Sequence, residues 1–149
     1  MEKLNLPAYS FKVKKEDDKY FIFDNFRKKH LVLTPEEWVR QHFAQYMVDQ
    51  LGYPANLISL EYSLTVNKLI KRCDIVAFNR SGNPVVLVEC KSTKVKIDQK
   101  VFDQIATYNM QLNVPVLVVT NGLSHYCCLV DTKNKSYSFL KDVPKFDQF

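Results

Sequence analysis

Three charged residues lie at the ends of two neighbouring apolar runs of the sequence. Asp74 precedes the run Ile75–Phe78, and Glu89 and Lys91 lie at the end of the run Val85–Cys90. Side chains two residues apart on a strand point to the same face, so Glu89 and Lys91 share one. Burying such charges is unfavourable unless they are paired or bound to a metal ion. Asp74, Glu89 and Lys91 therefore form a candidate metal-dependent phosphodiesterase centre.

Two carboxylates and a lysine suit the cleavage of phosphodiester bonds. Hard oxygen ligands bind Mg²⁺, and the ion lowers the pKa of a bound water and neutralises charge that develops on the phosphate. We expect Asp74 and Glu89 to bind the ion, the backbone carbonyl of Cys90 to add a ligand, and Mn²⁺ to substitute for Mg²⁺. The Lys91 ammonium would orient the attacking water or stabilise the transition state. A purely structural Glu89–Lys91 pair is the alternative.

Further polar residues are candidates for the same site. Glu37 follows Thr34 by three residues, and a capping box at a helix start explains it without any catalytic role. A role in the site stays open for Glu37, with Glu36 as the fallback. Gln104 falls on the expected buried stripe of a second helix, where an amide needs a hydrogen-bonding partner. With Tyr108 one turn later, it should face the end of the strand that carries Glu89.

Other kinds of catalytic site find no support in the sequence. The histidines, His30, His42 and His125, are scattered, with His42 expected on the outer side of its helix, so no Ser-His pair or His-based metal site is indicated. The three glycines are isolated, which excludes a Walker A loop and a dinucleotide fingerprint, and with them an ATP site. The four cysteines lack zinc-site spacing and are expected to be reduced core thiols.

A first helix is predicted from Thr34 to about Leu51. Thr34 is the N-cap, Pro35 occupies the first helical position, and Gly52 ends the helix. Its inward face is marked by apolar residues at four-residue spacing: Val39, Phe43, Met47 and Leu51. Arg40 projects from the same side. Because a buried arginine needs a carboxylate nearby, the start of this helix should point at an acidic cluster.

A second helix is predicted from about Asp98 to Gln111. Asp98 can cap it, and Ile97 with Phe102 can form a hydrophobic staple. Its inward stripe is expected to comprise Ile97, Val101, Ile105, Tyr108 and Leu112. The β-branched run Pro115–Thr120 follows and should form a buried strand, parallel to the strand that carries Glu89.

The remaining pattern predicts strands. Residues 11–13 and 20–23 suggest a hairpin or two short strands. A meander of three strands is expected at residues 57–66, 73–78 and 85–90, with turns at 67–71 and 79–83. Residues 125–130 and 137–140 are expected to close the sheet as a hairpin. We therefore expect an α/β fold in which a mixed central sheet carries a helix on each face.

Length and composition indicate one ordinary globular domain spanning residues 1–149, with 46% hydrophobic and 25% charged residues. The start of the chain lacks a signal-peptide core and no stretch has the length of a membrane span, so a cytoplasmic protein is expected. The net charge of +5 is compatible with nucleic acid but is a mild excess. Lys94, Lys96 and Lys100 could contact phosphates or form a solvated face.

Four segments, in order, resemble the N-terminal nuclease domain of type I restriction enzyme R subunits, which belongs to the PD-(D/E)XK nuclease superfamily. The segments are Leu33–Gln41, Arg72–Val76, Val88–Lys91 and Gln104-x-x-x-Tyr108. The resemblance runs from about Phe11 to Val130 and covers most of the chain. It departs from the family where Cys73 replaces the proline of the name motif and where the helicase domains of a full R subunit are absent.

The resemblance implies a restriction-endonuclease-like core. In it Asp74 and Glu89 bind Mg²⁺, and Lys91 acts on the water or the transition state. Glu37 would correspond to the acidic residue on the helix, and Gln104 with Tyr108 to the motif that helps arrange the DNA strand.

Three functions follow as hypotheses. The first is a Mg²⁺-dependent DNA endonuclease of the restriction-modification type, with DNA and with restriction-modification subunits or a motor protein as partners. A homodimer would let one centre per chain cut both strands. The second is a catalytically silent DNA-binding or assembly module that kept the nuclease fold. The third is a junction or repair nuclease of the same superfamily.

Overall fold

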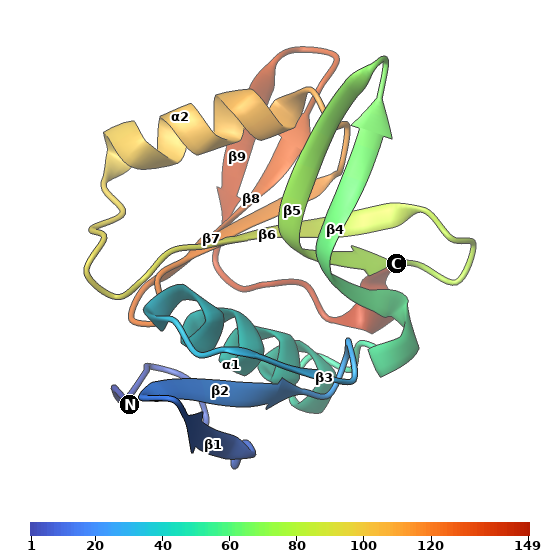
Figure 1. The fold of residues 1–149 in the computed structure, drawn as a ribbon. Coiled ribbons are helices and arrows are strands. Elements are labelled where there is room, and N and C mark those ends of the chain that lie inside the picture. The colour runs from blue at the N-terminus through green and yellow to red at the C-terminus, as the bar shows by residue number, and fades with distance from the viewer.

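A six-stranded sheet lies between two α-helices (Figure 1). The computed structural model describes the chain from Met1 to Phe149. Helix α1 (Pro35–Asp49) covers one face of the sheet and helix α2 (Gln99–Met110) the other. A small three-stranded sheet lies on the outer side of α1. The predicted α/β class, with a mixed sheet and a helix on each face, is confirmed.

The strands of the large sheet are adjacent in the order in which they occur along the chain. They are β4 (Ile58–Val66), β5 (Leu69–Phe78), β6 (Pro84–Cys90), β7 (Val116–Thr120), β8 (His125–Asp131) and β9 (Ser136–Leu140). Strands β4 to β6 form the predicted antiparallel meander, β6 and β7 run parallel, and β8 pairs with β9 as a hairpin.

Strand β5 begins four residues earlier than the sequence predicted, at Leu69 rather than Cys73. Only Asn67 and Lys68 separate it from β4, and both have positive φ angles of 49° and 70°. Two such residues make the tight turn that matches the twist of a hairpin. The longer hairpin extends beyond the body of the molecule (Figure 1) and places Lys71 on a strand instead of in a turn.

The small sheet consists of β1 (Val13–Glu16), β2 (Lys19–Asp24) and β3 (Lys29–Val32). The prediction of two strands missed β3. Its sequence Lys-His-Leu-Val is half polar and none of its side chains is buried, so it carries no alternating pattern. Short 3₁₀ helices η1 (Ala55–Leu57) and η2 (Phe146–Gln148) complete the fold.

Two apolar clusters hold the layers together. Val39, Phe43 and Met47 of α1 pack against one face of the large sheet, as predicted. Against the other face, α2 buries Phe102 and Ala106. The predicted α2 stripe is confirmed at Ile97 and Leu112, which are buried, and is wrong at Tyr108, which is exposed, while Val101 and Ile105 are half-buried. The buried face is centred on Phe102 instead, since Phe102 packs among aromatic rings: Tyr126, Tyr137 and Phe139.

The N-terminal segment covers the outer side of α1. His42 lies on that side, as expected, but it is buried beneath Tyr9, Phe11 and Trp38. The four cysteines are buried and unpaired, which confirms them as core thiols. Neither helix has the length and apolar composition that crossing a membrane would require.

Candidate functional site

Asp74 and Glu89 come together where strands β5 and β6 part. The ladder between the two strands begins at the pair Ile75–Val88, so Asp74 and Glu89 are the next residues in register. The carboxylate of Asp74 takes the place of the missing backbone partner: Cys90 N–H donates to its Oδ2 over 2.7 Å. This hydrogen bond fixes the Asp74 carboxylate against the backbone of β6 at Cys90, the residue that follows Glu89.

Arg40 gathers the acidic residues around Asp74. Its Nη2 lies 2.8 Å from Asp74 Oδ1, 2.6 Å from Glu61 Oε1 and 3.2 Å from Glu36 Oε1. Its Nη1 lies 2.5 Å from Glu37 Oε1. Burial alone would lower the pKa of Arg40, but the hydrogen bond to Asp74 and the charge of Glu37 raise it above its usual value. The predicted acidic cluster at the start of α1 is confirmed.

Glu36 and Glu37 have different surroundings although they are adjacent. Thr34 Oγ1 caps the Glu37 N–H over 3.0 Å, as predicted. The Glu37 carboxylate does not close a capping box, because it accepts hydrogen bonds from Arg27, Arg40 and Gln41. Glu37 is therefore buried inside a network that includes the Arg27–Asp24 pair.

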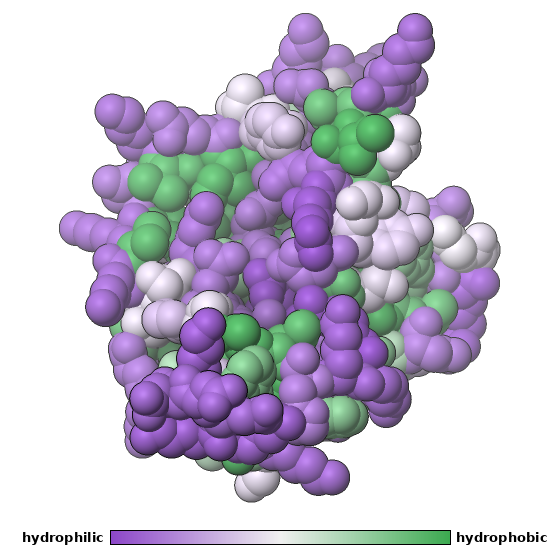
Figure 2. Space-filling model, in the orientation of Figure 1, coloured by the Kyte–Doolittle hydropathy of each residue, from purple (hydrophilic) through white to green (hydrophobic).

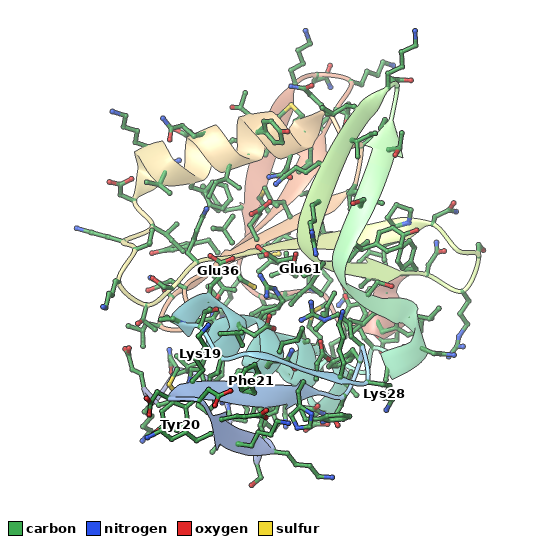
Figure 3. The ribbon with its side chains drawn as sticks, in the orientation of Figure 1. Lys19, Tyr20, Phe21, Lys28, Glu36 and Glu61 are labelled. Atoms are coloured by element: carbon green, nitrogen blue, oxygen red, sulfur yellow. The ribbon has the colours of Figure 1, made fainter.

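Glu36 instead faces the site. Its side chain is 46% exposed, and Figure 3 shows it in the region between α1 and the large sheet, near Glu61. Burial and the charge of Asp74 raise the pKa of Glu36, while Arg40 and Lys91 lower it. Glu36 is therefore close enough to Asp74 and Lys91 for both charges to act on its carboxylate.

Glu89 is paired with a lysine that sequence reasoning did not select. Lys71 Nζ of β5 contacts Glu89 Oε1 and lies over the ring of Tyr108, 5.1 Å from its centroid. Burial lowers the pKa of Lys71, but the hydrogen bond to Glu89 and the charges of Glu89 and Asp74 together outweigh it, and the net shift is upward. The structural Glu89–Lys91 pair considered as the alternative is absent. The Lys91 side chain lines the same pocket as Glu89 without an ion pair to it.

The pocket beside Glu89 has a volume of about 200 Å³. Its polar lining is Lys71, Glu89, Lys91, Gln104, Tyr108 and Asn109. Gln104 and Tyr108 face the end of the Glu89 strand, as expected. They were wrongly predicted to be buried, however: both are exposed, because α2 turns Phe102 and Ala106 toward the sheet instead. Hydrophilic side chains predominate between α2 and the β4–β5 hairpin (Figure 2).

Three residues of the site were not predicted from the sequence: Lys71, Glu61 and Asn109. Asn109 is buried, its Nδ2 donates to Ile105 O, and its Oδ1 has no partner. Glu61 has φ 53°, a left-handed conformation that is strained within a strand, and it contacts both Arg40 and Arg72. The unmet need of Arg40 for carboxylates was the one sequence signal that could have selected Glu61.

The donor set fits Mg²⁺. Asp74 and Glu89 supply hard oxygens, and no protein group donates to Glu89 Oε2. No group of three or more His, Cys, Asp or Glu side chains converges as a metal cluster. Mg²⁺ commonly binds through one or two carboxylates and completes its coordination shell with water and phosphate oxygens. The Cys90 carbonyl as a third ligand stays a prediction.

Comparisons with known proteins agree with one another. Residues 35–144 match the family described as "Type I restriction enzyme R protein N terminus (HSDR_N)". A solved structure of similar fold is a fragment of a protein described as an HsdR subunit of a type I restriction enzyme from Vibrio vulnificus YJ016. It aligns with a TM-score of 0.52 and 21% identity over 77% of this chain and 24% of that one. The chain thus spans about a quarter of that fragment. No curated protein sequence matches significantly.

Proposed function

Because the chain belongs to the family of type I restriction enzyme R protein N termini, we propose that it is a Mg²⁺-dependent endonuclease domain that cleaves DNA phosphodiester bonds. Family membership confirms the resemblance drawn from the four sequence segments and gives the chain its relation to restriction-modification. One observation carries the finer proposal. Asp74 and Glu89 meet where β5 leaves β6, with Lys91 lining the pocket beside Glu89.

Each residue then has a chemical role. Asp74 and Glu89, with the Cys90 carbonyl, would hold Mg²⁺, which supplies an acidic bound water and neutralises charge on the phosphate. The Lys91 ammonium orients the attacking water or stabilises charge in the transition state. We assign the part of the acidic residue on the helix to Glu36 rather than Glu37, since the Glu36 side chain is 46% exposed and faces the site, whereas that of Glu37 is buried among Arg27, Arg40 and Gln41.

Gln104 and Tyr108 are proposed to contact the DNA. Both are exposed on α2 and line the pocket that holds Glu89. The amide can hydrogen-bond to a phosphate or a base edge, and the ring can stack on a base.

Plasmid cleavage in the presence of Mg²⁺ or Mn²⁺ tests the proposal. Asp74→Asn preserves the shape of the side chain but removes its charge, and Lys91→Ala removes the ammonium. Both variants should cut at least about 100-fold more slowly than the wild type, as expected for loss of a group that stabilises the transition state. Lys141→Ala, which changes an exposed lysine outside the site, should retain activity.

Equal cutting by all four proteins would point to a contaminating nuclease and refute the proposal. Preferential cutting of branched DNA would indicate a junction or repair nuclease.

A catalytically silent DNA-binding or assembly module is the second candidate. One observation favours it: both carboxylates already form ion pairs within the protein, Asp74 with Arg40 and Glu89 with Lys71. Calorimetry separates the two functions. Metal binding that Glu89→Ala does not weaken, or no metal binding at all, would favour the silent module.

The partners of the chain are proposed on the same basis. We infer that it acts on DNA together with restriction-modification subunits or a motor protein, in the cytoplasm. ATP would then be bound outside this chain, and cutting of both strands would pair two copies.

A further inference from the structure

Two protein cations hold the two carboxylates of the site, and they are bound very differently. Arg40 contacts four carboxylates that come from α1, β4 and β5, and its side chain is only 7% exposed. Lys71 has one carboxylate partner, Glu89, and its second contact is the face of the Tyr108 ring.

These contacts determine which cation can leave. Removing the guanidinium of Arg40 would leave one buried and three partly exposed carboxylates without their shared counter-charge, which is strongly unfavourable. Arg40 is therefore a fixed positioning residue for Asp74. The Lys71 ammonium ends a flexible four-carbon stem, and it borders a pocket whose other wall is the exposed Tyr108. Moving into that pocket would break one ion pair, to Glu89, and the contact with the Tyr108 ring.

An ammonium and a divalent ion compete for the same carboxylate. Lys71 Nζ lies on Glu89 Oε1, and the charges of both Glu89 and Asp74 act to raise its pKa, so both carboxylates are near it. Two cations drawn to one small group of oxygens repel each other, and this repulsion weakens the binding of the second cation.

We propose, on the basis of the proposed nuclease function, that the Lys71 ammonium occupies the position on the Glu89 carboxylate at which Mg²⁺ would bind, and that Lys71 must leave Glu89 before the ion can bind there. Lys71 thus lowers the affinity of the resting site for the ion, while Arg40 stays on Asp74 throughout. Lys71 and Arg40 thus neutralise part of the negative charge of the site while no ion is bound.

Calorimetric titration of the whole chain with Mg²⁺ tests this competition. Lys71→Gln should bind Mg²⁺ about fivefold to tenfold more tightly than the wild type, the order expected when a partly buried ion pair no longer competes. Lys68→Gln removes the same charge from the same hairpin, at an exposed lysine without an ion pair, and should change affinity by less than about twofold. Glu89→Gln should abolish binding.

Side-chain NMR of the lysine ammonium groups gives a second readout. Saturating Mg²⁺ should shift the Lys71 Nζ resonance and leave that of Lys68 in place. If Lys71→Gln binds no tighter than Lys68→Gln while Glu89→Gln abolishes binding, the competition is refuted and the nuclease proposal stands. If neither the wild type nor Lys71→Gln binds Mg²⁺, both proposals fail. Binding by Lys71→Gln alone would support the displacement.

Discussion

At the scale of single residues, Arg40 determines how the acidic side chains are arranged. Four carboxylates surround one guanidinium, and two further arginines neutralise part of the excess: Arg27 on Glu37 and Arg72 on Glu61. Without these cations, the carboxylates at the start of α1 and on β4 and β5 would repel one another. Arg40 therefore links the fold to the site.

Replacement of Arg40 should be severely destabilising. We expect Arg40→Met to lower the free energy of unfolding by about 3–5 kcal/mol, because it leaves buried carboxylates without their counter-charge. Arg72→Met is the matched control, since Arg72 also contacts Glu61 but its side chain is 69% exposed. Arg72→Met should lower the free energy of unfolding by less than about 1 kcal/mol, as expected for an exposed ion pair. Urea denaturation measures both, and equal losses would contradict the role assigned to Arg40.

His42 should make stability depend on pH. Burial lowers its pKa, against the opposing hydrogen bond to Trp38 O. In the unfolded chain its pKa is about 6.5, so below that pH the unfolded state binds a proton that the folded state resists. The contribution of His42 to stability is therefore complete above pH 6.5 and is lost as the pH falls toward its folded pKa.

Two variants isolate this effect. The free energy of unfolding can be measured in urea at pH 7.5 and at pH 5.5. Between these two pH values it should fall less for His42→Phe than for the wild type. His30 is exposed, so for His30→Phe the free energy of unfolding should fall by as much as for the wild type. The assignment would be wrong if the two variants declined equally.

At the scale of elements, local patterns in the sequence were sufficient to predict where the helices begin, but not which face of α2 packs against the sheet. Thr34 and Asp98 cap α1 and α2 through Glu37 N–H and Val101 N–H, as predicted. Capping depends on a few consecutive residues, so it can be recognised without knowledge of the fold. The face that α2 buries depends on Phe102 meeting aromatic side chains from β8 and β9, which are distant in sequence.

The loop between β7 and β8 holds the N-terminal segment, and Gly122 is critical there. Asn5 N–H donates to Gly122 O over 2.8 Å. Gly122 has φ 85°, and a Cβ would lie 2.8 Å from a Leu4 methyl and 3.1 Å from a Val39 methyl. Gly52 has a similar φ of 78° with open space around it.

Alanine substitutions at these two glycines should therefore differ. Both introduce left-handed strain of about 1–2 kcal/mol, and Gly122→Ala adds overpacking of about 1–3 kcal/mol. Thermal or urea unfolding should show Gly122→Ala to be clearly the less stable. Equal stability would mean that Leu4 moves aside without cost and that the N-terminal segment is held elsewhere.

At the scale of the whole molecule, the site is assembled from segments far apart in the sequence. Asp74, Glu89 and Lys91 could be selected because charges at the ends of buried strands are conspicuous. Lys71 could not, since its place depends on a hairpin turn of two residues instead of the expected five. The choice between Glu36 and Glu37 depends on how α1 meets β4 and β5, which no local pattern determines.

The proposed function requires Asp74 and Glu89 to share one divalent ion. Crystals of the chain can be soaked in Mn²⁺ and measured at the manganese absorption edge. We predict an anomalous peak between these carboxylates, within about 2.0–2.5 Å of an oxygen of each, with Lys71 moved away from Glu89. A map without a peak there, or with manganese bound only at other carboxylates, would refute the shared site.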